Sequence, residues 1–289
     1  MAYLRIDHVT KVYPVLDDKA RKGETFVVFH NVTFEIQKGE FLTMIGHSGC
    51  GKSTLLNLIA GFDQPSEGGI ILEGREVTRP GLDRMVVFQS FALMPWLSAF
   101  DNVRIGVRQA HPDWSAERTR EWTQKYISLM NLHGAEKKRP AFLSGGMRQR
   151  VGLARAFAVE PKVLLLDEPF AQIDALTRVG IQEELLRMWA ETRNTVFMVT
   201  HDVDEAILLS DRIALMTNGP DAELAEILDV TIPRPRSRAQ LIDLPEYVRL
   251  RNQVLHFLVK GAKKEKHTGA QPRTNGEPSA KPRTQSTLS

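Results

Sequence analysis

The chain has 289 residues, of which 42% are hydrophobic and 25% charged, enough for a soluble protein with a sizeable core. No apolar run approaches the roughly 18 residues needed to cross a bilayer, and the first residues do not resemble an export signal. We therefore expect any membrane-spanning part to belong to another chain. The single cysteine, Cys50, excludes an internal disulfide and favours a reducing compartment.

The net charge of +3 arises mostly at one end of the chain. Residues 260–289 contain seven Lys or Arg and two Glu, together with many Pro, Gly, Ser and Thr. This composition predicts a disordered basic tail that keeps the protein in solution. Because the basic excess lies on a tail and not on a folded face, we expect no nucleic-acid partner.

Strands are predicted to dominate the first 45 residues. Residues 25–29 and 32–36 carry the β-branched and aromatic bias of two strands, and residues 37–40 have the composition of a turn. Residues 41–45 follow as a short buried strand.

A phosphate-binding loop is predicted between that strand and a helix over residues 54–60. The segment fits the pattern G-x-x-x-x-G-K-[ST], in which glycines let backbone N–H groups approach phosphate oxygens. Lys52 would bind the β- and γ-phosphates, and the Ser53 hydroxyl would bind Mg²⁺. The predicted nucleotide-binding residues of this loop are Gly46, His47, Ser48, Gly49, Cys50, Gly51, Lys52, Ser53 and Thr54.

Further along, the pattern predicts an α/β arrangement with a parallel sheet. Strands are expected at residues 69–74 and 84–89, followed by a helix over 116–132 whose apolar stripe suits the core. The apolar runs 163–166 and 196–199 suit strands covered on both faces, and an amphipathic helix over 176–192 separates them.

An acidic pair ends the first of these apolar runs. Asp167 is placed to hold Mg²⁺, and Glu168 is placed to polarise a water molecule that attacks the γ-phosphate. Such a pair is otherwise common as a solvated strand end, but a phosphate-binding loop upstream in the same predicted sheet favours the catalytic interpretation.

A second anion-binding device is predicted from Ser144, Gly145 and Gly146, which precede a helix expected over residues 148–158. A helix start offers unpaired N–H groups to an anion. With the preceding leucine these residues form the sequence Leu-Ser-Gly-Gly, by which the chain resembles the ATP-binding subunits of ABC transporters. The resemblance covers roughly residues 3–230.

The resemblance implies a fold and a division of the chain. The expected fold is an α/β phosphate-loop NTPase with a RecA-like parallel-sheet core, an N-terminal antiparallel β subdomain and an inserted helical signature subdomain. The nucleotide-binding domain would occupy residues 1–230, with the helical subdomain at about 90–160. A C-terminal extension with one helix, over residues 231–259, and the tail at 260–289 would follow.

Further site residues come from the resemblance alone. Gln89 resembles the glutamine that reaches Mg²⁺ and the attacking water, Glu168 the catalytic glutamate, and His201 the switch histidine that contacts the γ-phosphate. The metal ligands would be Ser53, Gln89 and Asp167, and Asp174 resembles the aspartate of the loop at the dimer contact, the D-loop.

Three details depart from the family pattern. Tyr13 resembles the aromatic residue that stacks on adenine, but an insert-like stretch at 14–23 follows it, so Phe26 and Phe29 are alternatives. The signature continues with Met147 where the family has glutamine. The D-loop carries Gln172, and the effect of that residue is open.

The resemblance also implies ATP and Mg²⁺ as cofactors and a set of protein partners. The chain would pair with a second ATPase subunit, either a copy of itself or a paired paralogue, so that Ser144, Gly145 and Gly146 contact ATP bound by the partner subunit. Transmembrane permease subunits would dock near residues 90–97, and an extracytoplasmic solute-binding protein would deliver the solute. The expected location is the cytoplasmic face of the inner membrane.

The overall sequence, including residues 93–97, 218–220 and 233–236, most resembles the ATPases of nitrate/nitrite importers. Bicarbonate, sulfonate and taurine importers are the alternatives. A soluble ABC-type ATPase acting on nucleic acid or ribosomes is a rival of another class, disfavoured by the single cassette and the absence of a heptad run. A phosphate-loop kinase would lack the Leu-Ser-Gly-Gly sequence.

Overall fold

The structure is a computed structural model that describes residues 2–15 and 24–265, with side chains up to residue 260. Most of the insert-like stretch predicted at 14–23, and the predicted tail beyond residue 265, lie outside the described residues.

A small antiparallel sheet forms the first layer, with strand order β2-β1-β4-β5. Its strands are β1 (Leu4–Pro14), β2 (Thr25–Ile36), β4 (Glu67–Leu72) and β5 (Arg75–Glu76). The prediction of separate strands at 25–29 and 32–36 is wrong, because β2 runs through both. Asn31 takes a left-handed backbone with φ 50°, and the pairing of β1 with β2 shifts register nearby, so the irregularity is a bulge and not a turn.

The central layer is a six-stranded sheet with order β10-β9-β3-β8-β7-β6. Its strands are β3 (Phe41–Ile45), β6 (Arg84–Val87), β7 (Val163–Asp167), β8 (Thr195–Thr200), β9 (Arg212–Met216) and β10 (Leu224–Asp229). All neighbours are parallel except β10, which is antiparallel to β9. All six residues of β8 are buried, as expected for a strand covered on both faces.

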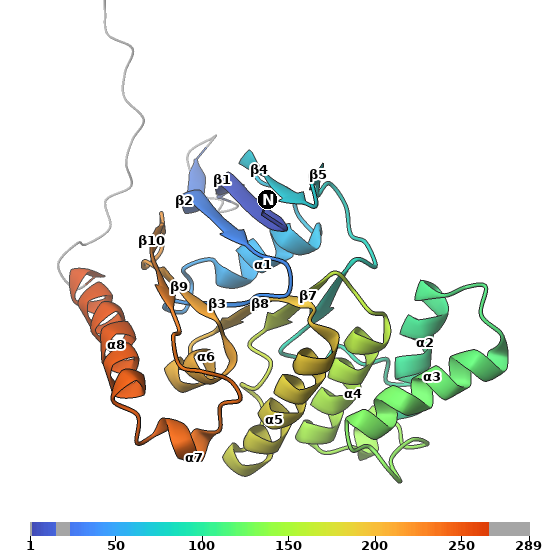
Figure 1. Cartoon of the computed structure of the whole chain (residues 1–289). Coiled ribbons are helices and arrows are strands. Elements are labelled where there is room, and N and C mark those ends of the chain that lie inside the picture. Colours follow the sequence, from blue (N-terminus) through green and yellow to red (C-terminus); the bar gives the residue numbers. More distant parts are fainter. Residues whose placement is uncertain (1, 16–23, 266–289) are drawn as a thin grey trace, which may run out of the picture.

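Two apolar cores lie on opposite faces of this sheet, and Figure 1 shows the layers that enclose them. Leu42 and Met44 of β3 pack with α1 (Lys52–Ala60) and the small sheet. Phe41 and Ile45 pack toward the helices of the other face, which include α5 (Ala175–Thr192) and α6 (Val203–Leu209). The alternation of side chains along β3 therefore supplies both cores.

A helical lobe is inserted between β6 and β7 and consists of α2 (Ala99–Ala110), α3 (Ala116–Leu129), the short 3₁₀ turn η1 (Pro140–Phe142) and α4 (Gly145–Ala158). It stands to one side of the sheets (Figure 1). Helix α4 begins before the predicted start at residue 148, because the Ser144 Oγ accepts a hydrogen bond from the Met147 N–H and so caps the helix at Gly145.

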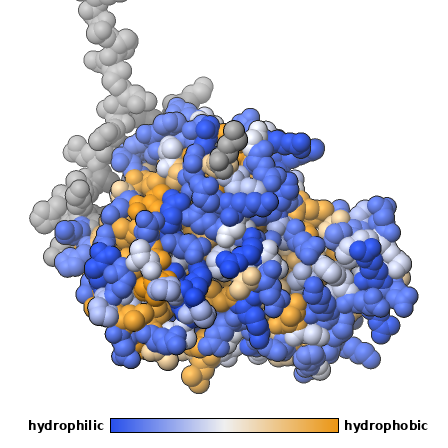
Figure 2. All heavy atoms as spheres, in the orientation of Figure 1, coloured by the Kyte–Doolittle hydropathy of each residue, from blue (hydrophilic) through white to orange (hydrophobic). Residues whose placement is uncertain are grey.

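The chain ends with an α7–α8 segment, which comprises α7 (Arg238–Leu241) and α8 (Pro245–Glu265). Helix α8 continues beyond the end expected near residue 260, and Leu250 and Val254 bury its inner face. Apolar surface is visible near β10 in Figure 2. Ile242 and Val248 of the α7–α8 segment are exposed. No helix of the described residues has the length and apolar character to cross a membrane.

Candidate active site

The predicted phosphate-binding loop joins the end of β3 to the start of α1. Gly49 and Gly51 have φ angles of +81° and +95°, a left-handed backbone that favours glycine. A Cβ on Gly51 would lie 2.6 Å from Val28 Cγ1 and 2.7 Å from Phe29 Cδ1. Glycine is therefore needed at residue 51 both for its backbone conformation and for close packing.

The ammonium group of Lys52 lies inside this loop. Its Nζ donates to the carbonyl oxygens of Gly46 and His47, at 2.8 and 2.9 Å, and the side chain is almost fully buried. A full positive charge is thus held where the loop backbone curls, as binding of a polyphosphate requires. Burial raises the pKa of the Cys50 thiol, so this side chain remains protonated near neutral pH and serves as packing.

Ser53 and Asp167 bring two oxygen ligands together from distant parts of the chain. The Ser53 hydroxyl donates to Asp167 Oδ1 at 2.8 Å. Burial raises the pKa of Asp167, and the neighbouring charge of Glu168 raises it further. A hydroxyl and a carboxylate fit the oxygen preference of Mg²⁺, which usually takes few protein ligands. Within residues 2–15 and 24–265 no cluster of three or more His, Cys, Asp or Glu forms a metal site.

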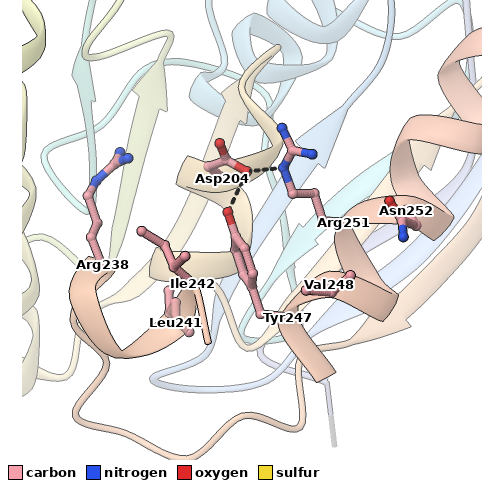
Figure 3. Close-up of a pocket in the computed structure, with 8 residues that line it drawn as sticks. All are labelled: Asp204, Arg238, Leu241, Ile242, Tyr247, Val248, Arg251 and Asn252. Atoms are coloured by element: carbon pink, nitrogen blue, oxygen red, sulfur yellow. Dashed lines mark hydrogen bonds and ion pairs between the residues drawn. The ribbon is translucent and has the colours of Figure 1, made fainter. Parts of the chain in front are cut away.

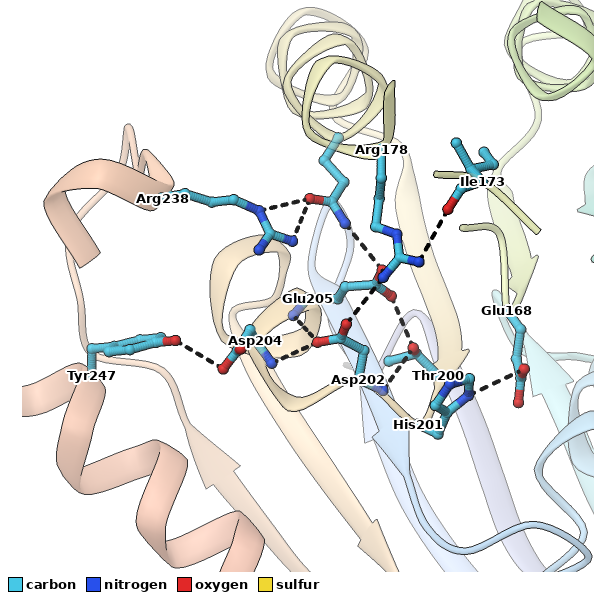
Figure 4. A network of polar contacts seen from close by, with 11 residues as sticks. Glu168, Ile173, Arg178, Thr200, His201, Asp202, Asp204, Glu205, Arg238 and Tyr247 are labelled. Carbon is cyan, nitrogen blue, oxygen red and sulfur yellow. Dashed lines mark hydrogen bonds and ion pairs between the residues drawn. The ribbon is translucent and has the colours of Figure 1, made fainter. Parts of the chain in front are cut away.

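Glu168 and His201 meet at the ends of adjacent strands. Asp167 of β7 lies opposite Val199 of β8, which brings the next residues of both strands together. Glu168 Oε2 and His201 Nδ1 are 3.2 Å apart (Figure 4). Glu168 also has a left-handed backbone with φ 43°, a strained conformation that is common at functional sites.

Gln89 projects from the same edge of the sheet. It follows the end of β6, where Val87 lies opposite Leu166 of β7, and it is exposed. We call this place, at the carboxyl ends of β3, β6, β7 and β8, the carboxyl edge of the sheet. The structure therefore brings together the loop, Gln89, the acidic pair and His201, as the sequence predicts. Their catalytic roles stay predictions.

The signature and the D-loop pack against each other within one chain. A Cβ on Gly145 would lie 3.4 Å from the Gln172 carbonyl oxygen of the D-loop, and one on Gly146 would lie 2.3 Å from Thr177 Cγ2 in the first turn of α5, so a side chain at residue 146 would displace Thr177. Asp174 caps α5 by accepting from the Thr177 N–H at 3.0 Å. Met147 packs partly buried against the core, and the cap at Ser144 is intact, so the departure from glutamine leaves the local fold undisturbed.

The three aromatic candidates for adenine stacking differ in exposure. Phe29 is fully buried and is excluded, whereas Tyr13 and Phe26 are 39% and 44% exposed and lie opposite each other on β1 and β2. The Tyr13 hydroxyl donates to Asp63 Oδ2 at 2.7 Å, and the Lys11 ammonium covers one ring face at 4.6 Å.

Sequence reasoning missed a polar network next to His201, formed by Arg178, Gln182, Thr200, Asp202, Asp204, Glu205 and Arg238. Asp202 gave a usable signal, because an aspartate followed by two acidic residues is typical of a helix start, and it caps α6. The remaining residues stand in ordinary helical sequence.

The family model described as "ABC transporter" matches residues 29–171. The ATP-binding cassette MJ0796, solved as a dimer in a post-hydrolysis state with ADP and Pi, superposes with a TM-score of 0.69 and 30% identity. The match covers 80% of this chain and 100% of that cassette, and it confirms the predicted fold.

Curated relatives agree. The chain is 47% identical to the nitrate import ATP-binding protein NrtD of Synechococcus elongatus, over 89% of this chain and 92% of NrtD. It is 46% identical to the bicarbonate transport ATP-binding protein CmpD of the same species, over 89% and 90%. It is also 47% identical to NrtC, a nitrate import ATP-binding protein of Synechocystis sp., but it spans 39% of that longer protein.

Proposed function

Because the chain belongs to the ABC transporter family, as one of its ATP-binding proteins, we propose that it hydrolyses ATP to drive an importer, with nitrate or nitrite as the favoured solute. The observation that carries the ATPase assignment is the carboxyl edge of the sheet. There Ser53 and Asp167 are 2.8 Å apart, and Glu168 and His201 are 3.2 Å apart.

Each group at this edge has a role that its position supports. Lys52 and the loop N–H groups bind the phosphates, while Glu168 accepts a proton from the attacking water. His201 contacts the γ-phosphate, and its side chain is 64% exposed and thus open to a ligand. Gln89, exposed beside them, orients the water.

Mg²⁺ would be held by Ser53, Asp167 and Gln89. When bound, the ion neutralises charge on the phosphate oxygens. Burial raises the pKa of Asp167, and a bound cation would favour its ionised form.

A second ATPase subunit would complete each site. Ser144 caps α4 and is exposed, so it would be accessible to ATP held by the partner subunit. The dimeric state of the MJ0796 cassette supports such a pairing. The partner is either a second copy of this chain or a paralogue.

Transmembrane permease subunits would dock beside Gln89, on residues 90–97. Trp96 is 68% exposed there, and an apolar surface of this kind suits a partner helix. The complex would place the chain on the cytoplasmic face of the inner membrane, with an extracytoplasmic solute-binding protein on the other side.

Bicarbonate is the second candidate solute, because the relatives named for bicarbonate and for nitrate transport are nearly equally similar. The test is uptake of nitrate, bicarbonate and taurine in a strain that lacks this chain. We expect loss of nitrate uptake alone, restored by the wild-type chain and not by Glu168→Gln. Loss of bicarbonate uptake would select the second candidate, and loss of taurine uptake would contradict both.

The rival of another class is tested by ATPase stimulation and fractionation. A transporter subunit should co-purify with membranes only when its permease is expressed. Stimulation of ATP hydrolysis by RNA, DNA or ribosomes, without membrane association, would favour the soluble ATPase.

A further inference from the structure

The α7–α8 segment lies outside the phosphate-binding machinery, yet it is attached to α6, the helix that follows His201 (Figure 1). Its attachment is polar as well as apolar, and it falls at three points. The first two points reach residues close to His201 in the chain, and the third reaches the phosphate-binding loop.

The first point is Asp204, near the start of α6. The Tyr247 hydroxyl and the Arg251 Nε both donate to its Oδ1, each at 2.8 Å (Figure 3). These residues line a cavity of about 380 Å³ between α6, α7 and α8. One carboxylate oxygen of α6 thus binds two residues of α8. The bond from Arg251 is charge-assisted, and such bonds are stronger than hydrogen bonds between neutral groups.

The second point is a buried chain of hydrogen bonds from α7 to β8 (Figure 4). Arg238 donates from Nε and Nη2 to Gln182 Oε1, at 3.1 and 2.7 Å. Gln182 Nε2 donates to Glu205 Oε1 at 3.1 Å, and Glu205 Oε2 accepts from the Thr200 hydroxyl at 2.9 Å. Thr200 directly precedes His201, and the side chains of Gln182, Glu205 and Thr200 are 0%, 3% and 2% exposed.

The residue on the other side of His201 is held by the same network. The Asp202 N–H donates to the Thr200 hydroxyl at 3.1 Å, and Arg178 pairs with Asp202 Oδ2 at 3.4 Å. Arg178 also donates to the Ile173 carbonyl oxygen in the D-loop at 3.1 Å. Both neighbours of His201 are therefore fixed, and the D-loop is fixed with them.

The third point is the phosphate-binding loop. His47, the second residue of that loop, forms a hydrogen bond through Nε2 with the Leu258 carbonyl oxygen of α8, at 2.8 Å. Near its own start α8 thus contacts α6, and further along it contacts the phosphate-binding loop.

We propose that the α7–α8 segment positions His201 for ATP hydrolysis, with Tyr247 and Arg251 acting through Asp204, and Arg238 acting through Gln182 and Glu205. These are positioning residues, since none of them lies at the carboxyl edge. The inference rests on the proposed ATPase function and deepens it. Misplacement of a reacting group by about 1 Å costs up to about a hundredfold in rate. Loosening the segment that carries His201 should therefore lower kcat.

The experiment compares ATP hydrolysis by the isolated full-length chain with Tyr247→Phe combined with Arg251→Gln. The matched control is Arg249→Gln on the same helix, whose partner Glu246 lies three residues earlier on α8 itself. We expect kcat of the double variant to fall about five- to twentyfold, with KM and the ATP dissociation constant within about twofold of wild type. The control should match wild type.

Rates are expressed per ATP-binding site, so that partial unfolding does not mimic the effect. The two changes are then repeated in a His201→Ala background, where we expect no further loss of kcat. A further loss of the same size in that background, or a double variant that hydrolyses ATP like the control, would overturn the positioning role.

Failure of the broader proposal would look different. A wild-type chain that does not hydrolyse ATP would overturn the ATPase assignment and the positioning role with it. Uptake of another solute would change only the assignment of the importer, because this assay measures ATP hydrolysis alone.

Discussion

The carboxyl edge of the sheet and the network beneath it are neighbours with opposite characters. At the edge the side chain of His201 is 64% exposed and Gln89 is exposed. In the network Gln182, Glu205 and Thr200 are almost fully buried and bonded to each other. Buried polar groups usually find partners inside the protein. The edge leaves His201 and Gln89 accessible to a ligand, whereas the network uses its polar groups to fix the backbone.

The two regions also differ in how well the sequence predicts them. Lys52, Glu168 and Ser144 each belong to a short motif whose neighbours predict its chemistry. The contacts of the α7–α8 segment join residues far apart, such as Tyr247 with Asp204 or His47 with Leu258, and no short motif marks them. The residues predicted to bind ATP are thus recognised from short motifs, whereas the residues that position them are recognised only from contacts in the structure.

The largest expected effect lies at the edge. Glu168→Gln should lower kcat for ATP hydrolysis by about 10²- to 10³-fold, because the amide no longer accepts a proton from the attacking water. ATP affinity should remain within a few-fold, since the side chain keeps its shape. Steady-state ATPase assays and calorimetric ATP titration would measure both. Glu183→Gln, an exposed glutamate of α5, is the control, and normal turnover of Glu168→Gln would contradict the role.

The polar network should make the free energy of unfolding depend on pH. Burial, with help from Asp202, raises the pKa of Glu205 to about 7, although Thr200, Arg178 and Arg238 lower it. Because this folded-state pKa lies above the ordinary value of 4.5, the stabilising contribution is complete below that value. It is lost as the pH rises through about 7.

Glu205→Gln should remove this dependence. Its free energy of unfolding, relative to wild type, should rise by on the order of 3 kcal/mol between pH 4.5 and 8. Denaturant unfolding of both proteins at several pH values would measure the difference. A difference that stays constant across that range would show that Glu205 does not titrate there.

Much of the fold was predictable because its signals are periodic. The continuous apolar runs of β7 and β8 predicted buried parallel strands, and both strands are parallel and buried. The single strand β2 was not predictable, because a bulge and a turn use the same residue types. The start of α4 was placed late because glycines normally weaken a helix, while the cap at Ser144 and the fit of Gly146 against Thr177 outweigh that cost.

The residues of the candidate site that belong to short motifs could be predicted from the sequence. Lys52, Ser53, Asp167 and Glu168 were predictable from their own motifs, whereas Gln89 and His201 were expected only from the family resemblance. The exclusion of Phe29 could not be predicted, since its burial comes from long-range packing in the core between the small sheet and α1. Arg178, Gln182 and Arg238 occupy helices where an arginine or glutamine usually faces solvent.

Lys52→Ala tests whether the loop acts on phosphate. ATP affinity should fall about 10- to 100-fold, the range expected when a charged hydrogen-bond donor is lost. AMP affinity should change little, because Lys52 would bind the β- and γ-phosphates. Titration calorimetry with both nucleotides measures this, and Lys125→Ala on α3, an exposed lysine, is the control. Equal losses for ATP and AMP would indicate a general collapse of the loop.

The smallest expected effect concerns the antiparallel sheet, where Tyr13 and Phe26 are both exposed and lie opposite each other, and where the family resemblance favours Tyr13 as the residue that stacks on adenine. Stacking of a base on an aromatic ring contributes about 1 kcal/mol or more, so Tyr13→Ala should weaken ATP binding about fivefold and Phe26→Ala should leave it unchanged. Every base has an aromatic face, so ATP and GTP should lose affinity equally. The reverse order of the two variants would assign the base to Phe26, and a loss confined to ATP would mean that hydrogen bonds, and not stacking, recognise it.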